Sequence, residues 1–400
     1  MTLARTALVI GGGIAGPVTA MALHRAGVEA TVFEAHDEPA DGVGGMLGLA
    51  PNGLAALDVI GVRQEVGAAG RPMPSMIMRS WTGKQLAEFG DPAGPPAMHT
   101  IWRRDLHAVL HRQATGRGIR TEFGKRLSRL ENTGNSVTAY FADGTSASAD
   151  VLIGADGIRS TVRNLLDTSA PHPRYTGLIA FGGRVKPGAD LGVPSTCGSL
   201  HMVYGKQAVF AYGVYDDGDA GWFANVPAKQ AISRREAQQV GAAEWLRRLA
   251  TVFAGDRSPA VRLLEATDPN EMVIVGALED LPAVPTWHNG RVALVGDAAH
   301  ATSPSSGQGA SIAIESGVQL ARCLRDLPVE QAFDAYERLR RDRVERIIAA
   351  GANINRKKAP GPLARALRDM FLPTMLKLVV KPEKMAWQLD YRIDWDSPVS

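Results

Sequence analysis

The chain has 400 residues, of which 45% are hydrophobic and 21% charged, with a formal net charge of +3 at pH 7. This length exceeds what one hydrophobic core usually supports, so two domains are expected in an otherwise ordinary globular protein. The weak net charge argues against a nucleic-acid-binding protein, and the lack of any apolar run of membrane-spanning length argues against a membrane-spanning protein. The presence of only two cysteines argues against a fold held by disulfides or by a cysteine-bound metal.

The first segment predicts a dinucleotide-binding loop. An apolar strand over 7–10 leads directly into a Gly-x-Gly-x-x-Gly pattern. In this pattern one glycine makes the turn, one admits a pyrophosphate and one packs the following helix on the strand. A second strand is predicted over 30–33, and Glu34 stands at its carboxyl end, where ribose hydroxyls are expected. The candidate nucleotide contacts are Gly11, Gly13, Ile14, Ala15, Gly16, Glu34 and Ala35.

A second strand-and-turn motif follows in the middle of the chain. A helix is predicted after Arg103, strands and hairpins over 120–150, and then an apolar strand over 151–153. This last strand ends in Gly-Ala-Asp-Gly, which contains Asp156. Taken alone, the motif favours an ordinary turn in which Asp156 caps the next helix. Its combination with the other two motifs favours a cofactor-binding role.

From about residue 173 the pattern changes to short β-rich stretches separated by Gly and Asp, at 175–184, 199–204, 208–215 and 222–226. These stretches predict an antiparallel sheet with one face toward a cleft, which would form a substrate lid. The substrate-pocket candidates are His201, Tyr212, Trp222 and, further along the chain, Pro304. For each of the three in the sheet, an ordinary packed side chain is the alternative interpretation.

The third motif is the most informative one. An apolar strand over 292–295 ends in Gly-Asp-Ala-Ala-His, and a glycine-rich loop and a helix over 310–327 follow. The Asp297 carboxylate can accept hydrogen bonds from sugar-alcohol hydroxyls, and the helix start offers N–H donors to a ring edge or phosphate. His300 is expected to make a structural hydrogen bond near this site. The predicted contacts are Gly296, Asp297, Pro304, Gly307, Gln308, Gly309 and Ala310.

The last part of the chain is predicted to be helical. The run 338–346 holds five arginines among acidic residues and predicts a solvent-exposed helix face with ion pairs. The apolar stretch 372–380 is expected to pack as a terminal helix.

Together the three motifs resemble those of single-component FAD-dependent aromatic hydroxylases, the p-hydroxybenzoate hydroxylase-like flavoprotein monooxygenases. The resemblance covers most of residues 1–345 and is strongest to the urate- and salicylate-hydroxylase-like branch, which includes tetracycline-modifying members. Further matches are Gly44–Leu49, Pro51–Gly53, Arg103 with Leu106, and the helix at 335–338. The family commonly has an acid one residue after Glu315, whereas this chain has Ser316.

The resemblance implies an α/β fold in three parts. A Rossmann-like FAD-binding domain would comprise 1–70, 98–173 and 276–330, an inserted antiparallel β-sheet substrate domain 71–97 and 174–275, and a C-terminal helical segment 331–400. From the family, Arg103 is expected at the FAD phosphate or ribityl region, Asp156 at FAD and the nicotinamide, and Asp297 at the ribityl chain.

The implied reaction is hydroxylation of an electron-rich aromatic or polyketide-like small molecule by FAD, NADPH or NADH, and O₂, through a C4a-hydroperoxyflavin. No metal is expected, and the protein is expected to be a cytoplasmic monomer or homodimer that binds neither nucleic acid nor membrane. Three alternatives share the fold: a flavin halogenase, a prenyl reductase and an FAD-binding protein without turnover. Trp222 resembles part of the tryptophan motif of halogenases, but the second tryptophan of that motif is missing at position 224.

Overall fold

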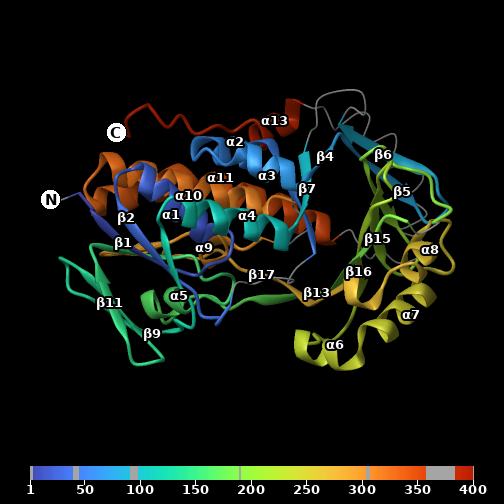
Figure 1. Ribbon diagram of the computed structural model, residues 1–400, viewed down its shortest axis with the longest axis horizontal. Helices are drawn as coiled ribbons and strands as arrows, with labels where there is room; N and C mark the ends of the chain where they lie inside the picture. The colour runs from blue at the N-terminus through green and yellow to red at the C-terminus, as the bar shows by residue number, and fades with distance from the viewer. Residues whose placement is uncertain are drawn as a thin grey trace.

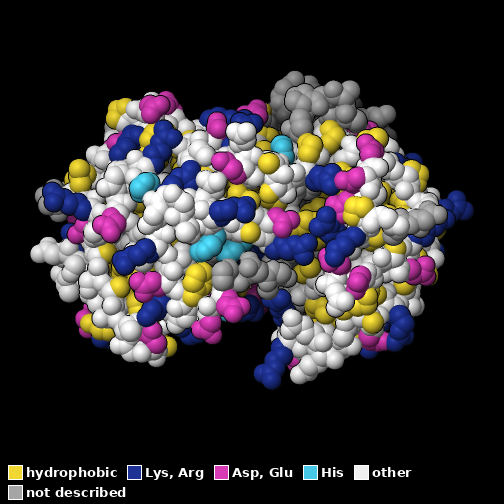
Figure 2. All heavy atoms as spheres, viewed as in Figure 1, with side chains coloured by type: hydrophobic (Ala, Val, Ile, Leu, Met, Phe, Trp, Pro, Cys, Tyr) yellow, Lys and Arg dark blue, Asp and Glu magenta, His cyan; other side chains and the backbone are white. Residues whose placement is uncertain are grey.

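The computed structural model describes residues 3–38, 45–90, 98–188, 191–302, 307–356 and 383–399. The predicted contact Pro304 and the predicted terminal helix over 372–380 lie outside these ranges. Two halves stand side by side, one built on a parallel sheet and the other on an antiparallel sheet (Figure 1). Lys and Arg side chains lie among Asp and Glu side chains on the face shown in Figure 2.

A six-stranded sheet in the order β18-β19-β12-β1-β2-β8 forms the core of the first half. Strands β19, β12, β1, β2 and β8 run parallel, and β18 is antiparallel to β19. Parallel strands covered on both faces need nearly continuous apolar sequence, which is what β1 and β12 have. The strands are β1 (Thr6–Ile10), β2 (Glu29–Phe33), β8 (Arg120–Glu122), β12 (Val151–Gly154), β18 (His288–Asn289) and β19 (Val292–Leu294).

Two central helices, α1 and α10, pack against each other beside this sheet (Figure 1). Small residues allow the close approach: a Cβ on Gly317 would lie 2.4 Å from the Thr19 hydroxyl oxygen. The helices of this half are α1 (Ala15–Arg25), α2 (Pro51–Val59), α3 (Arg63–Ala69), α4 (Arg103–Gly116), α5 (Thr161–Leu166), α9 (Asp297–His300), α10 (Gly309–Asp326), α11 (Val329–Arg356) and α13 (Glu383–Leu389).

The second half is a seven-stranded sheet in the order β17-β13-β16-β15-β14-β5-β6. It contains the four β-rich stretches expected from the sequence, so the prediction of an antiparallel insert is confirmed, although β5 and β14 pair in parallel. Its strands are β5 (Ser75–Ser80), β6 (Gln85–Gly90), β13 (Arg174–Val185), β14 (Leu200–Tyr204), β15 (Val209–Val214), β16 (Ala220–Pro227) and β17 (Met272–Asp280). The last of these spans the expected domain boundary at 275–276, and the exact division into domains stays a prediction.

Three short helices cover one face of the seven-stranded sheet and leave the other face toward the first half (Figure 1). They are α6 (Arg234–Val240), α7 (Ala242–Phe253) and α8 (Ala260–Glu265), followed by the 3₁₀ turn η1 (Pro269–Glu271). Their apolar residues form a core with alternate residues of the strands, because successive side chains of a strand point to opposite faces.

Two three-stranded sheets complete the fold. The sheet β3-β7-β4 lies between the halves and consists of β3 (Met46–Leu49), β7 (Met98–Trp102) and β4 (Arg71–Met73). The sheet β11-β10-β9 consists of β9 (Leu127–Asn132), β10 (Val137–Phe141) and β11 (Ser146–Ala149). In the part of the chain that the structure describes, no helix is both long and apolar enough to cross a membrane.

Candidate active site

The three sequence motifs meet at one edge of the parallel sheet. They follow β1, β12 and β19, which are direct neighbours in the sheet, and Glu34 follows β2 beside them. Backbone hydrogen bonds link the turns in sequence: the N–H of Gly11 donates to Phe33, that of Ala155 to Ile10 and that of Val295 to Gly154. Because parallel strands end at the same edge, segments more than 280 residues apart form one continuous rim of turns.

Two glycines of the first loop are required because a side chain would collide with the backbone. The third leaves space where a ligand can bind. Gly11 has φ +109°, and a Cβ there would lie 2.5 Å from the Ala155 carbonyl oxygen. A Cβ on Gly16 would lie 1.9 Å from the carbonyl oxygen of Gly11. A Cβ on Gly13 would meet nothing within 4 Å. Gly13 therefore faces open space, which is the position where the pattern admits a pyrophosphate.

Glu34 stabilises the glycine loop from the neighbouring strand. Its carboxylate accepts hydrogen bonds from the backbone N–H groups of Gly12 at 2.7 Å and His36 at 2.9 Å. On the other side of the loop, His107 Nε2 lies 2.8 Å from the Gly12 carbonyl oxygen. The acid is thus in place beside the loop, and its contact with a ribose stays a prediction.

The N-cap of helix α5 is Ser160, and Asp156 binds further N–H groups of the same helix start, close to the simpler interpretation of its motif. One carboxylate oxygen accepts from the Ser160 hydroxyl at 2.5 Å, and the other accepts from the backbone N–H groups of Thr161 and Val162. Burial raises the pKa of Asp156, although these hydrogen bonds favour the carboxylate. The buried Arg163 guanidinium then donates to the Ala298 carbonyl at 3.0 Å, joining the second motif to the third. The predicted role of Asp156 toward FAD and nicotinamide is compatible with this position but is not tested by it.

Asp297 begins the short helix α9 immediately after Gly296. Gly296 has φ +60°, and a Cβ there would lie 2.9 Å from the Ala15 Cβ, so a glycine is needed where the third motif crosses the first. The Asp297 side chain keeps solvent-accessible area, yet protein surrounds it closely enough for burial to raise its pKa, an effect that the charge of Arg103 partly offsets. The structure thus brings Asp297 and Arg103, 194 positions apart, within electrostatic reach.

The start of helix α10 is held by a buried polar network. Asn52 Nδ2 donates to Gln308 Oε1 at 3.0 Å and to Glu315 Oε1 at 2.6 Å, and all three residues are buried. Gln308 and Gly309 therefore have fixed positions, while Gly307 is exposed and Ala310 lies in the first turn of α10. Helix α10 has no side-chain cap, so its first N–H groups are available to a ligand.

The same network corrects one expectation from the sequence. The arginine-rich run was expected to form a solvent-exposed helix face, but Arg340 is fully buried and its Nη1 lies 2.6 Å from Glu315 Oε2. Arg343 contacts the other side of Glu315 at 2.9 Å and also donates to the carbonyl oxygens of Trp387 and Gln388 in α13. Burial would raise the pKa of Glu315, but the two guanidinium groups outweigh it and the pKa is lowered. Arg341 does form the expected exposed pairs along the helix.

His300 has the structural surroundings expected of it. Its Nε2 lies 2.9 Å from the Ser316 hydroxyl, and its ring packs on Trp287. Burial, with a smaller effect of Arg340, lowers the pKa of His300 to about 3, so the imidazole is neutral at physiological pH. Arg340 also donates to Ser316 Oγ at 3.3 Å, so Ser316, the departure from the family pattern, is a shared partner of both residues.

The three pocket candidates of the seven-stranded sheet point away from the parallel sheet. Trp222 is fully buried, stacks on Phe210 and donates its indole N–H to Thr267 at 2.9 Å. Tyr212 belongs to the same helix-covered core, and its hydroxyl lies 3.0 Å from Nδ1 of His201, its cross-strand neighbour. A substrate bound between the two sheets would not reach these side chains. The halogenase-like Trp222 is a core residue of this sheet.

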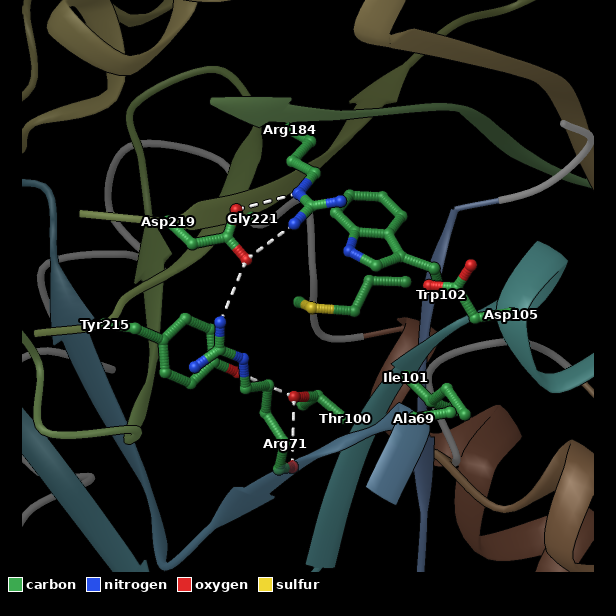
Figure 3. Close-up of a pocket in the computed structure, with 11 residues that line it drawn as sticks. Ala69, Arg71, Thr100, Ile101, Trp102, Asp105, Arg184, Tyr215, Asp219 and Gly221 are labelled. Atoms are coloured by element: carbon green, nitrogen blue, oxygen red, sulfur yellow. Dashed lines mark hydrogen bonds and ion pairs between the residues drawn. The ribbon is translucent and has the colours of Figure 1, made fainter. Parts of the chain in front are cut away.

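A pocket lies between the three-stranded sheet and the opposite, uncovered face of the seven-stranded sheet (Figure 3). Arg184 of β13 forms two hydrogen bonds with Asp219, at 2.7 and 3.1 Å, and Arg71 of β4 contacts Asp217 at 2.6 Å. Other lining residues are Met46, Ala69, Thr100, Ile101, Trp102, Asp105, Tyr215 and Gly221. No group of three or more side chains suited to a metal ion occurs within the described ranges.

The surroundings of the turns fit an FAD molecule. Gly13 faces open space, helix α1 begins without a side-chain cap, and Asn52 Oδ1 is buried with no hydrogen-bond partner among the described residues. Uncapped N–H groups suit a pyrophosphate, and a free buried acceptor suits a donor on the bound molecule. The roles of Asn52, Glu315 and Arg340 could not be predicted from the sequence, because their pairing depends on how α2, α10 and α11 pack.

The comparisons with known proteins identify the family of the chain. A protein-family profile described as an FAD binding domain matches residues 4–258 and 265–350. The FAD-dependent urate hydroxylase of Klebsiella pneumoniae is 31% identical over 351 residues, which cover 86% of this chain and 87% of that protein. The 6-hydroxynicotinate 3-monooxygenase of Pseudomonas fluorescens is 30% identical over 352 residues, covering 85% and 88%.

A solved structure extends the agreement to the fold. The crystal structure of Klebsiella pneumoniae HpxO complexed with FAD and uric acid matches with a TM-score of 0.82 at 26% identity, covering 96% of this chain and 95% of that one. The tetracycline destructase Tet(55), at 22% identity and a TM-score of 0.70, shares the fold. Since the family profile spans most of the chain and its relatives match along nearly their whole length, the protein belongs to the family of FAD-dependent aromatic hydroxylases and is an FAD-binding monooxygenase.

Proposed function

We propose that this protein uses NAD(P)H and O₂ to hydroxylate a small, electron-rich aromatic compound at its flavin. The observation that carries the proposal is the meeting of the three motifs and Glu34 at one edge of the parallel sheet, opposite the uncovered face of a second sheet. One atom of O₂ would enter the product and the other would leave as water, with two electrons supplied by NAD(P)H. The urate and 6-hydroxynicotinate enzymes among the relatives support a ring as the substrate.

When bound, FAD supplies the redox chemistry, and the chain positions and shields it. In this proposal Gly13 and the start of α1 hold the pyrophosphate, Glu34 the adenosine ribose, and Asp297 with Arg103 the ribityl and phosphate region. The N–H groups at Gly309 and Ala310, at the helix start that Gln308 and Asn52 hold in place, would face the ring. The uncovered face of the seven-stranded sheet would exclude water from the reacting edge.

The nicotinamide has to reach the flavin from solvent, since the described residues contain a single parallel sheet with a dinucleotide loop. Asp156 stands next to that loop and remains our candidate for a contact to both cofactors. We also propose a monomer or homodimer in the cytoplasm, because NAD(P)H is regenerated there.

The test is the mass of the product formed under ¹⁸O₂. Purified protein should be yellow and release FAD on acid treatment. With NAD(P)H and a panel of phenols and hydroxylated heteroaromatics, a responsive substrate should accelerate flavin reduction and gain one labelled oxygen. A chlorinated product in the presence of chloride, a product with a reduced double bond, or a product without label would overturn the proposal.

A further inference from the structure

The uncovered face of the seven-stranded sheet and the facing three-stranded sheet together form a methionine cluster. It consists of Met46, Met73, Met76, Met98 and Met202 with Leu200, Ala211 and Phe223. The register shows that its members share one face: Met202 is directly opposite Ala211, which is directly opposite Phe223. Five of the twelve methionines of the chain meet here, although they are spread over five strands.

The cluster adjoins the flavin-binding rim. Met46 follows Gly45, whose carbonyl oxygen accepts a hydrogen bond from the Arg103 N–H at 3.2 Å. A Cβ on Gly182, in the same sheet as Phe223, would lie 3.8 Å from the Gly45 Cα. A molecule held against the cluster would therefore lie next to the segment that carries Arg103, close to where a flavin ring must react.

The cluster is more accessible than an ordinary core. Met46, Met76, Met98, Met202 and Phe223 lie between two sheets, yet all five keep partly exposed side chains. Apolar surface that stays accessible inside a protein suits an apolar ligand. Methionine is flexible and polarizable, and its sulfur makes favourable contacts with aromatic rings. The walls can therefore adapt to an aromatic guest of irregular outline.

Two cationic side chains beside the cluster are already paired with acids. Met46 also lines the pocket of Figure 3, together with Arg71 and Arg184. Both guanidinium groups are paired, Arg184 with Asp219 through two hydrogen bonds and Arg71 with Asp217. An anionic ligand would therefore have to break one of these pairs or be buried without a counter-charge, and both are unfavourable.

We propose that the substrate is a neutral, apolar aromatic compound, such as an alkylated or polycyclic phenol, bound against the methionine cluster, and that anionic aromatics are rejected. This inference rests on the proposed hydroxylase function. The proposed substrate differs from urate and 6-hydroxynicotinate, after which two of the relatives are named. Those polar and ionisable rings need polar partners that the methionine cluster does not offer.

The first test compares 2-naphthol with 3-hydroxy-2-naphthoate, which adds a carboxylate to the same ring system. Each is titrated into the FAD-loaded protein at pH 7 while the flavin absorption spectrum is recorded. The neutral naphthol should bind at least tenfold more tightly. Equal or tighter binding of the carboxylate overturns the proposal, as does the absence of binding by naphthol and by larger neutral phenols up to their solubility limits.

Charged substitutions at Met202 provide the second test. M202K should weaken 2-naphthol about tenfold and tighten 3-hydroxy-2-naphthoate, whereas M202E should weaken both, the carboxylate more; M202L should change neither. V275K is the control, since it adds the same charge to an exposed position of the same sheet. If M202K and M202E retain FAD and still bind the two naphthol ligands with the wild-type ratio of affinities, the proposal is overturned. If both variants lose FAD, the comparison of the two ligands in the wild-type protein decides.

The outcomes separate this inference from the function on which it rests. If naphthol perturbs the flavin and is preferred but no label from ¹⁸O₂ enters any product, the substrate class stands and the hydroxylase function fails. If labelled product forms only from anionic rings, the function stands and the substrate class fails.

Discussion

The parallel sheet and the seven-stranded sheet position their functional groups by different means. On the parallel sheet the site is made by backbone: turns after β1, β12 and β19, glycines in close contact, and uncapped helix starts. On the seven-stranded sheet the proposed site is made by side chains, and which of them face the parallel sheet depends on the register of each strand. A backbone site tolerates changes in neighbouring side chains, whereas a one-residue change of register exchanges the two faces of a sheet.

The largest effect is expected from a side chain placed on the backbone site. G13V should abolish FAD retention while leaving the fold intact, because Gly13 faces open space that a bound pyrophosphate would occupy. The measurement is the ratio of flavin to protein absorbance after purification, with circular dichroism as the check on folding. G116V is the control, since a Cβ there also meets nothing within 4 Å but Gly116 lies at the end of α4, away from the loop. Equal FAD content in both variants would contradict the comparison.

The next effect concerns the buried ion pairs that join helix α10 to helix α11. E315Q leaves Arg340 buried without its counter-charge and should lower the free energy of unfolding by about 3–5 kcal/mol. The control E345Q removes an exposed partner of Arg341 and should cost less than about 0.5 kcal/mol. Both values are measured by denaturant unfolding of the FAD-loaded protein. A cost of E315Q no larger than that of E345Q would show that the network does not stabilise the contact between the two helices.

The pH dependence of stability gives the same network a second test. The pKa of Glu315 is lowered in the folded protein by Arg340 and Arg343 despite its burial. Its contribution is therefore complete above the ordinary pKa of a glutamate and is lost as the pH falls through the lowered value. The stability of the wild type should decrease more steeply below about pH 4.5 than that of E315Q. Parallel curves would contradict this assignment.

The sequence predicts the site on the parallel sheet better than the site on the seven-stranded sheet. The glycine loop, Glu34, Asp156 and Asp297 could be identified because each follows an apolar strand at a fixed spacing, and the structure brings them together. The substrate face could not be identified, because alternation shows that a strand has two faces but not which one a helix covers. Trp222 and Phe223 are adjacent in sequence and belong to opposite faces. The Glu315–Arg340 pair could not be predicted, because the spacing of residues along α11 does not show that α10 packs against Arg340 and buries it.

A smaller effect is expected at the ribityl position of the backbone site. D297A should weaken FAD binding by about 1–3 kcal/mol through the loss of charge-assisted hydrogen bonds, while the glycine loop still holds the other half of the cofactor. FAD affinity is measured by fluorescence titration of the apoprotein. D58A, at an exposed carboxylate on α2, serves as the control. If D297A binds FAD as tightly as D58A does, the assignment of Asp297 to the ribityl chain is wrong.

The smallest effect should come from the helix-covered face of the seven-stranded sheet. Y212F removes the hydroxyl that lies 3.0 Å from His201 Nδ1, and the loss should cost about 1 kcal/mol of stability, as for other buried hydrogen bonds. Because Tyr212 points toward α6–α8, the Kd of a bound phenol and the rate of its hydroxylation should not change. F223L, one strand away and on the methionine cluster, should raise the Kd severalfold at similar stability. Both variants are compared by flavin difference spectra with 2-naphthol and by thermal unfolding. If Y212F weakens the phenol more than F223L does, the substrate lies on the helix-covered side, and the orientation of the sheet drawn from its register has to be reversed.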